Sequence, residues 1–203
     1  NGAGKSTTMN ILTGYIGATS GTVKINGYDI LNQPEEAKKC VGYLPELPPL
    51  YMDMTVAEYL KFVAELKKIE KKKRKEMIND AMEMTGVSDV SERIIKNLSK
   101  GYRQRVGFAQ AVLGYPQIII LDEPTVGLDP KQIIEIRELI RELGKKHTII
   151  LSSHILSEIS AVCDHVFIIS KGKLVASDTT ENLTNLMSGG QEIELTLRSD
   201  EEQ

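Results

Sequence analysis

The chain has 203 residues, of which 41% are hydrophobic and 26% are charged, and this composition excludes a mostly disordered protein. Lys and Arg total 25 against 28 Asp and Glu, and a formal net charge of −3 does not indicate a general nucleic-acid binder. No apolar stretch approaches the roughly 20 residues that cross a bilayer, and Cys40 and Cys163 lack metal-type spacing, so a cytosolic α/β enzyme is the starting expectation.

The chain begins within a glycine-rich segment that reads Asn-Gly-Ala-Gly-Lys-Ser-Thr. A loop of this kind needs a preceding strand, and its first glycine would lie two positions before Asn1, so we interpret the chain as an internal fragment of a longer protein. Further along, Asn26-Gly27 is the strongest short hairpin signal, and it joins predicted strands over Thr22–Ile25 and Tyr28–Leu31.

Helices are predicted over the following third of the chain. Thr55 and Glu58 form a capping box ahead of the first of them. The residues on its apolar face are Val56, Tyr59, Leu60, Val63 and Leu66. A charged run, Lys67–Glu76, follows and is interpreted as a solvated connection. Two more helices are expected, from about 74 to 85 and from about 99 to 114.

From residue 116 onward, strands and helices alternate. The apolar runs Ile118–Leu121 and Thr148–Leu151 are typical of parallel strands buried on both faces. Helices are expected over 129–144 and 156–163, and a second hairpin over 166–177. The alternation predicts right-handed parallel crossovers. The predicted fold class is α/β, with a parallel-sheet core over 1–54 and 114–190, a helical insert over 55–113, and the start of a truncated C-terminal extension, with a strand-like alternation, over 191–203.

The glycine-rich segment at the start of the chain is predicted to bind phosphate. Its glycines let backbone N–H groups turn toward phosphate oxygens, and the helix that follows points its positive end at them. Lys5 would reach the β and γ phosphates, and the Ser6 hydroxyl would bind Mg²⁺. The alternative is a glycine-rich turn before an ordinary helix. The candidate phosphate-binding residues are Asn1, Gly2, Ala3, Gly4, Lys5, Ser6 and Thr7.

Two carboxylates end the buried strand at Ile118–Leu121. Asp122 could anchor Mg²⁺, and Glu123 could orient or deprotonate an attacking water. Alternatively, the pair ends the strand simply where it meets solvent. Between these motifs, Ser99 can cap a helix whose N-terminus is an anion site, or it is an ordinary cap beside a basic face.

These three segments, in this order, together with Gly127-Leu128-Asp129-Pro130 and Ser152-Ser153-His154, resemble the ATP-binding cassette of ABC transporters. The spacing is similar too, with 23 residues from Ser99 to Asp122 and 31 from Glu123 to His154. The likeness covers about 1–190. It implies a P-loop NTPase (RecA-like) core with an antiparallel hairpin region and an inserted helical subdomain, and it implies ATP and Mg²⁺ as ligands.

The resemblance also implies roles for single residues. Ser99 and Gly101 belong to the family signature at Leu98–Tyr102, where they would lie nearest phosphate. Asp129 lies in the loop that communicates across a dimer. His154 is the switch histidine, which would contact the γ-phosphate and act with Glu123 in catalysis.

The chain departs from the usual family pattern at three positions. Lys100 and Tyr102 replace the commonest signature residues, and Lys100 adds a cation. Glu46 stands where many cassettes have a Mg²⁺-contacting glutamine, and a carboxylate can still bind the ion. The Tyr-Leu-Pro-Glu form resembles an exporter-type subgroup that includes multidrug- and polysaccharide-export relatives. The aromatic residue that stacks on adenine would lie upstream of residue 1.

The partners are likewise implied by the resemblance. Two cassettes, identical or different, would pack head to tail, each ATP lying between one phosphate loop and the other signature. Membrane-spanning permease subunits would hold the domain on the cytoplasmic membrane face, and no nucleic acid is expected. The loop before the helical insert would receive the permease through apolar side chains, or would pack on its own core. Those side chains are Leu47, Leu50, Tyr51 and Met52.

Two alternatives to an ATP-hydrolysing transporter subunit remain. A soluble cassette protein of the repair, chromosome or translation type is one, although the 93 residues between Lys5 and Ser99 leave no room for a long coiled coil. A translation-factor type would carry a second cassette. The other alternative is a nucleotide-binding module without turnover, and the complete set of Lys5, Asp122, Glu123 and His154 argues against it.

Overall fold

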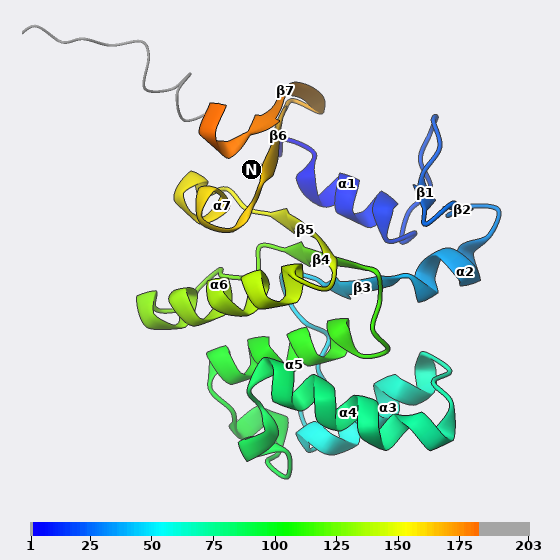
Figure 1. Ribbon diagram of the computed structural model, residues 1–203, viewed down its shortest axis with the longest axis vertical. Helices are drawn as coiled ribbons and strands as arrows, with labels where there is room; N and C mark the ends of the chain where they lie inside the picture. The colour runs from blue at the N-terminus through cyan, green and yellow to red at the C-terminus, as the bar shows by residue number, and fades with distance from the viewer. Residues whose placement is uncertain (1, 183–203) are drawn as a thin grey trace, which may run out of the picture.

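A three-stranded parallel sheet lies at the centre of the computed structural model, which describes residues 2–182 (Figure 1). Its strand order is β3 (Val41–Leu44), β4 (Ile118–Asp122), β5 (Thr148–Ser152). Leu44 pairs with Leu121, and Asp122 pairs with Ser152, so the carboxyl ends of the strands share one edge. The predicted parallel α/β fold is confirmed. β3 was not predicted as a strand, because four residues containing Gly42 carry little pattern.

Helices lie on both sides of this sheet (Figure 1). On one side is α1 (Lys5–Leu12), and on the other are α5 (Lys100–Val112) and α6 (Pro130–Gly144). α7 (Leu156–Val162) follows β5 and contacts α6. One apolar cluster runs from the sheet through α5 into the helices beyond it, and it contains Leu121, Phe108 and Leu60.

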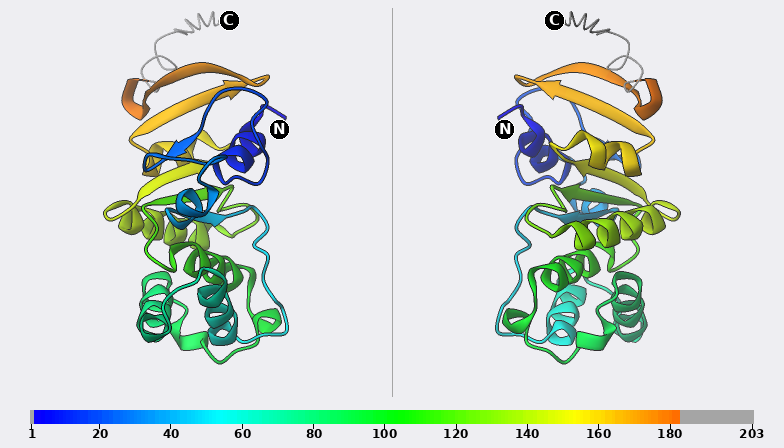
Figure 2. Two further views of the ribbon diagram at one scale, coloured as in Figure 1. Left: turned by 90° about the vertical axis from the view of Figure 1, so that its right-hand side faces the viewer. Right: turned by 90° about the vertical axis from the view of Figure 1, so that its left-hand side faces the viewer.

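The helical layer farthest from α1 consists of α3 (Val56–Leu66) and α4 (Lys71–Thr85), with 3₁₀ turns at Ser88–Val90 and Ile95–Asn97 (Figure 2). The predicted capping box is present: Glu58 N donates to Thr55 Oγ1, and Thr55 N donates to the Glu58 carboxylate. Leu66, the last residue of α3, departs from the predicted apolar face and is 64% exposed.

The charged run was predicted as a connection, and this is corrected over most of its length. α4 begins at Lys71, three residues before the expected start, so its basic residues form the first exposed turns of a helix. Strong helix formers such as Lys and Glu sustain a helix on the solvent side without an apolar partner at every turn. The boundaries predicted for the helical insert stay a prediction.

Short elements complete the fold. The two predicted hairpins are confirmed as β1 (Lys24–Ile25) with β2 (Tyr28–Asp29), and β6 (His165–Ser170) with β7 (Lys173–Thr179). In the first hairpin each strand has two residues, whereas four were predicted. A six-residue helix, α2 (Pro34–Lys39), was not predicted.

Two further expectations from the sequence concern the C-terminal segment and membrane-spanning helices. The alternating segment at 191–198 and the extension at 191–203 lie outside the described residues. None of the helices between residues 2 and 182 combines the length and the apolar character needed to span a bilayer.

Candidate functional site

The glycine-rich loop runs directly into α1, as predicted. Gly4 precedes the first helical residue, Lys5, with φ of 104°, a conformation that an L side chain rarely adopts. The Ala3 carbonyl accepts a hydrogen bond from the Gly172 N–H at 2.9 Å, so the turn between β6 and β7 supports the loop. Ser6 and Thr7 are exposed in the first turn of α1. Asn1 lies outside the described residues.

The Glu123 carboxylate joins the glycine-rich loop to the end of the sheet. Lys5 Nζ lies 3.3 Å from Glu123 Oε1 and also donates to the Ser153 carbonyl at 3.4 Å. His154 Nδ1 lies 2.8 Å from the other oxygen, Oε2. The Glu123 side chain is only 12% exposed, whereas that of His154 is 52% exposed. Three predicted residues that are far apart in the sequence therefore meet at one carboxylate.

The backbone at Glu123 departs from that of a regular strand. Its φ is 47°, and its N–H is within hydrogen-bond distance of the Ser152 carbonyl at 3.1 Å and of the Ser152 hydroxyl at 3.3 Å. The Ser152 hydroxyl in turn donates to the buried Asp122 carboxylate. Burial, with the nearby charge of Asp122, raises the pKa of the Tyr43 phenol on β3. The Asp122 carboxylate therefore lies at the carboxyl edge of the sheet, where the Ser152 hydroxyl holds it.

Glu46 lies near this edge but makes no direct contact with the cluster among the interactions of residues 2–182. It is exposed, and it follows the end of β3, whose last residue pairs with Leu121 next to Asp122. Its predicted contact with Mg²⁺ stays a prediction.

The signature segment lies at the N-terminus of α5. Ser99 is exposed, and its hydroxyl accepts a hydrogen bond from the Tyr102 N–H at 3.3 Å, which confirms the predicted helix cap. Gly101 is buried, and a Cβ there would lie 2.7 Å from the Gln132 amide group. The Lys100 ammonium lies against Gly127 of the same chain.

Asp129 caps α6. Its carboxylate accepts a hydrogen bond from the Gln132 N–H at 2.9 Å, and the residue is exposed. The starts of α5 and α6 therefore contact each other, through Gly101 and Gln132. α1 lies on the opposite side of the sheet from α5, so the signature and the glycine-rich loop of one chain occupy different sides (Figure 1).

Sequence reasoning missed the residues that surround the cluster of Lys5, Glu123 and His154. Gln104 of α5 donates to the Pro124 carbonyl at 2.9 Å, directly after Glu123. Glu158 of α7 accepts hydrogen bonds from Thr125 and Ser153 and is buried. The one available signal is proximity in the chain, since Thr125 follows Glu123 by two residues and Glu158 follows His154 by four.

The loop predicted to receive a partner is mostly exposed. Leu47 is 83% exposed, Tyr51 53% and Met52 37%, while Leu50 packs against the main core. Tyr51 also makes an edge-on contact with Phe62, at 5.2 Å between ring centroids. The loop thus packs partly on its own core and still presents apolar side chains, and its role as a docking surface stays a prediction.

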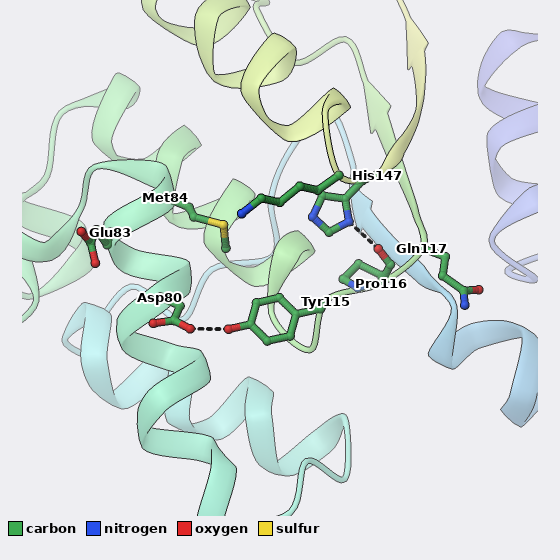
Figure 3. A pocket seen from close by; sticks show the side chains of 8 residues that line it. Asp80, Glu83, Met84, Tyr115, Pro116, Gln117 and His147 are labelled. Carbon is green, nitrogen blue, oxygen red and sulfur yellow. Dashed lines mark hydrogen bonds between the residues drawn. The ribbon is translucent and has the colours of Figure 1, made fainter.

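A hollow of about 590 Å³ lies elsewhere, between α4, the segment before β4 and the segment before β5 (Figure 3). The Tyr115 hydroxyl donates to the Asp80 carboxylate across it, and His147 Nδ1 lies 2.6 Å from the Pro116 carbonyl oxygen. Because these segments enter the amino ends of β4 and β5, the hollow is at the opposite edge of the sheet from Glu123.

Comparison with known proteins gives consistent matches. A family model described as ABC transporter matches residues 1–126. The bacitracin transport ATP-binding protein BcrA of Bacillus licheniformis is 42% identical over 177 residues, a stretch covering 86% of this chain and 57% of that protein. The chain thus spans little more than half the length of this curated relative.

Solved structures are similar as well. One described as the ATP binding subunit of an ABC transporter superposes with a TM-score of 0.79 at 31% identity, covering 93% of this chain and 79% of the other. CbiO1 from Clostridium perfringens, described as part of the ABC transporter complex cbiONQ, gives a TM-score of 0.83 at 26% identity, covering 93% and 78%.

Proposed function

Because this chain belongs to the ABC transporter family, as an ATP-binding domain of that family, we propose that it hydrolyses ATP with the help of Mg²⁺ and that this turnover drives a membrane-spanning partner. The observation that carries the proposal is the Glu123 carboxylate, which two nitrogen groups from different motifs contact, Lys5 at 3.3 Å and His154 at 2.8 Å.

The residues around Glu123 fit phosphoryl transfer to water. ATP, when bound, supplies the γ-phosphoryl group that water attacks. Glu123 acts as the base that orients and deprotonates this water, and its low exposure limits competition from bulk solvent. His154 holds Glu123 through Nδ1. Lys5, at the start of α1, carries the positive charge that phosphate oxygens need.

The same edge of the sheet fits a Mg²⁺ ion. Among residues 2–182, no three His, Cys, Asp or Glu side chains converge into a ready-made metal cluster. Mg²⁺ in nucleotide sites is typically held by one or two protein groups together with phosphate oxygens and water. Asp122 and the Ser6 hydroxyl are oxygen donors of the required kind, and Glu46 is our third candidate.

The signature is proposed to act on a second copy of the fold. Ser99 is exposed at the N-terminus of α5, which lies on the opposite side of the sheet from α1. A head-to-tail pair of domains would bring each signature to the ATP on the other phosphate loop, where a helix N-terminus and a hydroxyl favour anionic oxygen. Asp129, next to the signature, would then lie at the contact between the two copies.

We further propose that the domain is peripheral on the cytoplasmic membrane face and serves export. The exposed Leu47, Tyr51 and Met52 support a permease contact, because apolar side chains in one loop favour a protein partner. Glu46 and the Tyr-Leu-Pro-Glu sequence around it support the export direction.

The test uses the full-length protein and the variant Glu123→Gln, which keeps the size of the side chain and removes the base. We expect ATP binding to persist, phosphate release to fall by about 100-fold or more, and a nucleotide-bound dimer to accumulate. Glu138→Gln, at an exposed position of α6, is the matched control and should behave as wild type. Near wild-type turnover by Glu123→Gln would refute the assigned role.

A further inference from the structure

A buried carboxylate that the proposed reaction does not use lies behind the candidate site. Glu158, on α7, is 4% exposed. Its Oε2 accepts a hydrogen bond from the Thr125 hydroxyl at 2.6 Å and another from the Ser153 hydroxyl at 3.2 Å. Its Oε1 lies 3.9 Å from Arg137 Nη2 on α6. Burying a carboxylate this deeply destabilises the fold unless hydrogen-bond and ion-pair partners surround it. The three contacts are therefore needed to hold Glu158 in this position.

The two hydroxyl donors belong to the two segments that carry the catalytic candidates. Thr125 follows Glu123 by two residues, and Ser153 directly precedes His154. Both hydroxyl groups are on residues that are buried. The 2.6 Å distance from Thr125 is typical of a charge-assisted O–H···O⁻ bond, which is stronger than a hydrogen bond between neutral groups. Glu158 therefore ties the end of β4 to the end of β5 through side chains alone.

The Ser153 hydroxyl makes a second hydrogen bond. It accepts a hydrogen bond from the Ile155 N–H at 3.1 Å while it donates to Glu158. This pair of bonds fixes the turn that contains His154. On the other segment, Glu123 has a φ of 47°, a conformation that persists only where surrounding contacts hold it. The Thr125–Glu158 bond is one such contact, and the Glu123 N–H bonds to Ser152 are others.

We infer that Glu158 is a positioning residue that sets the Glu123 carboxylate relative to the His154 ring. The inference rests on the proposed function, because it assigns a means of alignment to the same hydrolytic site. Catalysis is sensitive to such alignment, since a displacement of about 1 Å can cost on the order of 100-fold in rate. Glu158 touches neither Glu123 nor His154 in the hydrogen bonds and ion pairs of residues 2–182, so it acts through Thr125 and Ser153.

The first test removes one hydroxyl from the full-length protein. Thr125→Val keeps the shape of the side chain and abolishes its bond to Glu158. We expect kcat for ATP hydrolysis to fall by about 10-fold while KM for ATP stays within about two-fold. Thr125→Ser retains a hydroxyl and should restore most of kcat. Thr148→Val is the matched control, because Thr148 is exposed at the start of β5, and it should leave both constants unchanged.

The second test is a double-mutant cycle between Thr125→Val and Glu158→Gln. If Glu158 acts through Thr125, the double variant loses no more kcat than the more impaired single variant. A merely structural role predicts a different pattern: a lower melting temperature and less folded protein, with kcat per folded molecule unchanged. That pattern, or losses of kcat that multiply in the double variant, would overturn the inference.

Glu123→Gln, measured in the same series, separates this inference from the proposed function. An inactive Glu123→Gln beside a Thr125→Val with wild-type kcat would refute the positioning role alone. A fully active Glu123→Gln would refute the hydrolytic assignment itself.

Discussion

The side of the sheet that carries the glycine-rich loop and the side that carries the signature segment hold their candidate functional groups in different ways. On the first side, Lys5, Glu123 and His154 come from three distant segments, and Lys5 and His154 both contact the Glu123 carboxylate within a single chain. On the second, Ser99 stands exposed at the start of α5, and the hydrogen bond that its hydroxyl accepts from the Tyr102 N–H caps its own helix. The first side is thus assembled by contacts within the chain, whereas the second presents the Ser99 side chain outward.

The signature helix, α5, is also anchored at its C-terminal end. Lys67, the C-cap residue of α3, donates from Nζ to the Gln110 carbonyl at 2.9 Å and to the Leu113 carbonyl at 2.7 Å. These carbonyls lie at the C-terminal end of α5, where a cation complements the helix dipole. These bonds fix the C-terminal end of α5, whereas Ser99 at its other end remains exposed.

The largest expected effect lies on the internally assembled side. Lys5→Met removes the cation that the phosphates need and one partner of Glu123, so we expect ATP turnover in the full-length protein to fall on the order of 1,000-fold, with loss of ATP binding by the monomer. Lys61→Met, at an exposed position of α3, is the control. If the Lys5→Met monomer still binds ATP, the contrast between the two sides is refuted.

An intermediate effect is expected at the anchor of the signature helix. Burial lowers the pKa of the Lys67 ammonium to about 8 from an ordinary 10.5. Between these two values the unfolded chain binds a proton at Lys67 that the folded chain has released, so stability rises with pH. We therefore compare the free energy of unfolding of the wild type with that of Lys67→Met. The wild-type value minus the variant value is expected to increase by about 3 kcal/mol from pH 8 to 10.5.

Denaturant unfolding of both proteins at several pH values measures this difference. If the wild-type free energy of unfolding minus that of Lys67→Met decreases between pH 8 and 10.5, the carbonyl acceptors stabilise the charged ammonium more than burial destabilises it.

The smallest effect is expected at the exposed signature. Ser99→Ala removes the cap of α5 at a cost of about 1 kcal/mol and should lower dimer-dependent turnover by about 10-fold, because the hydroxyl proposed to reach the partner's ATP is lost. ATP binding by the monomer should not change, and Ser88→Ala, at another exposed position, should be silent. If Ser99→Ala and Lys5→Met weaken ATP binding by the monomer to the same extent, the two sides do not differ in the way described.

The sequence predicts the parts of this molecule whose signals are local. The glycine-rich loop, the Thr55–Glu58 capping box, the Ser99 cap and both hairpins depend on residues only a few positions apart, and the structure contains each of them. The alternation of apolar runs and helices likewise predicts the parallel sheet, because the strands are buried on both faces.

Other features depend on contacts that no local pattern records. Lys67 reads as one more lysine in a charged run, yet its ammonium binds carbonyls more than forty residues away. Glu158 reads as a polar residue of a short helix, yet it is buried and accepts a hydrogen bond from the Thr125 hydroxyl 33 residues away. Their roles follow from tertiary packing, which sequence periodicity does not encode.

The hydrogen bond from Gly172 to Ala3 has a practical consequence for engineering. A shortened version ending between His154 and β6 would keep every motif residue from Lys5 to His154. It would nevertheless lose the N–H that holds the Ala3 carbonyl at 2.9 Å, and the backbone around Gly4 would lose its neighbour. A complete set of motifs is therefore a poor criterion for where such a domain can be cut.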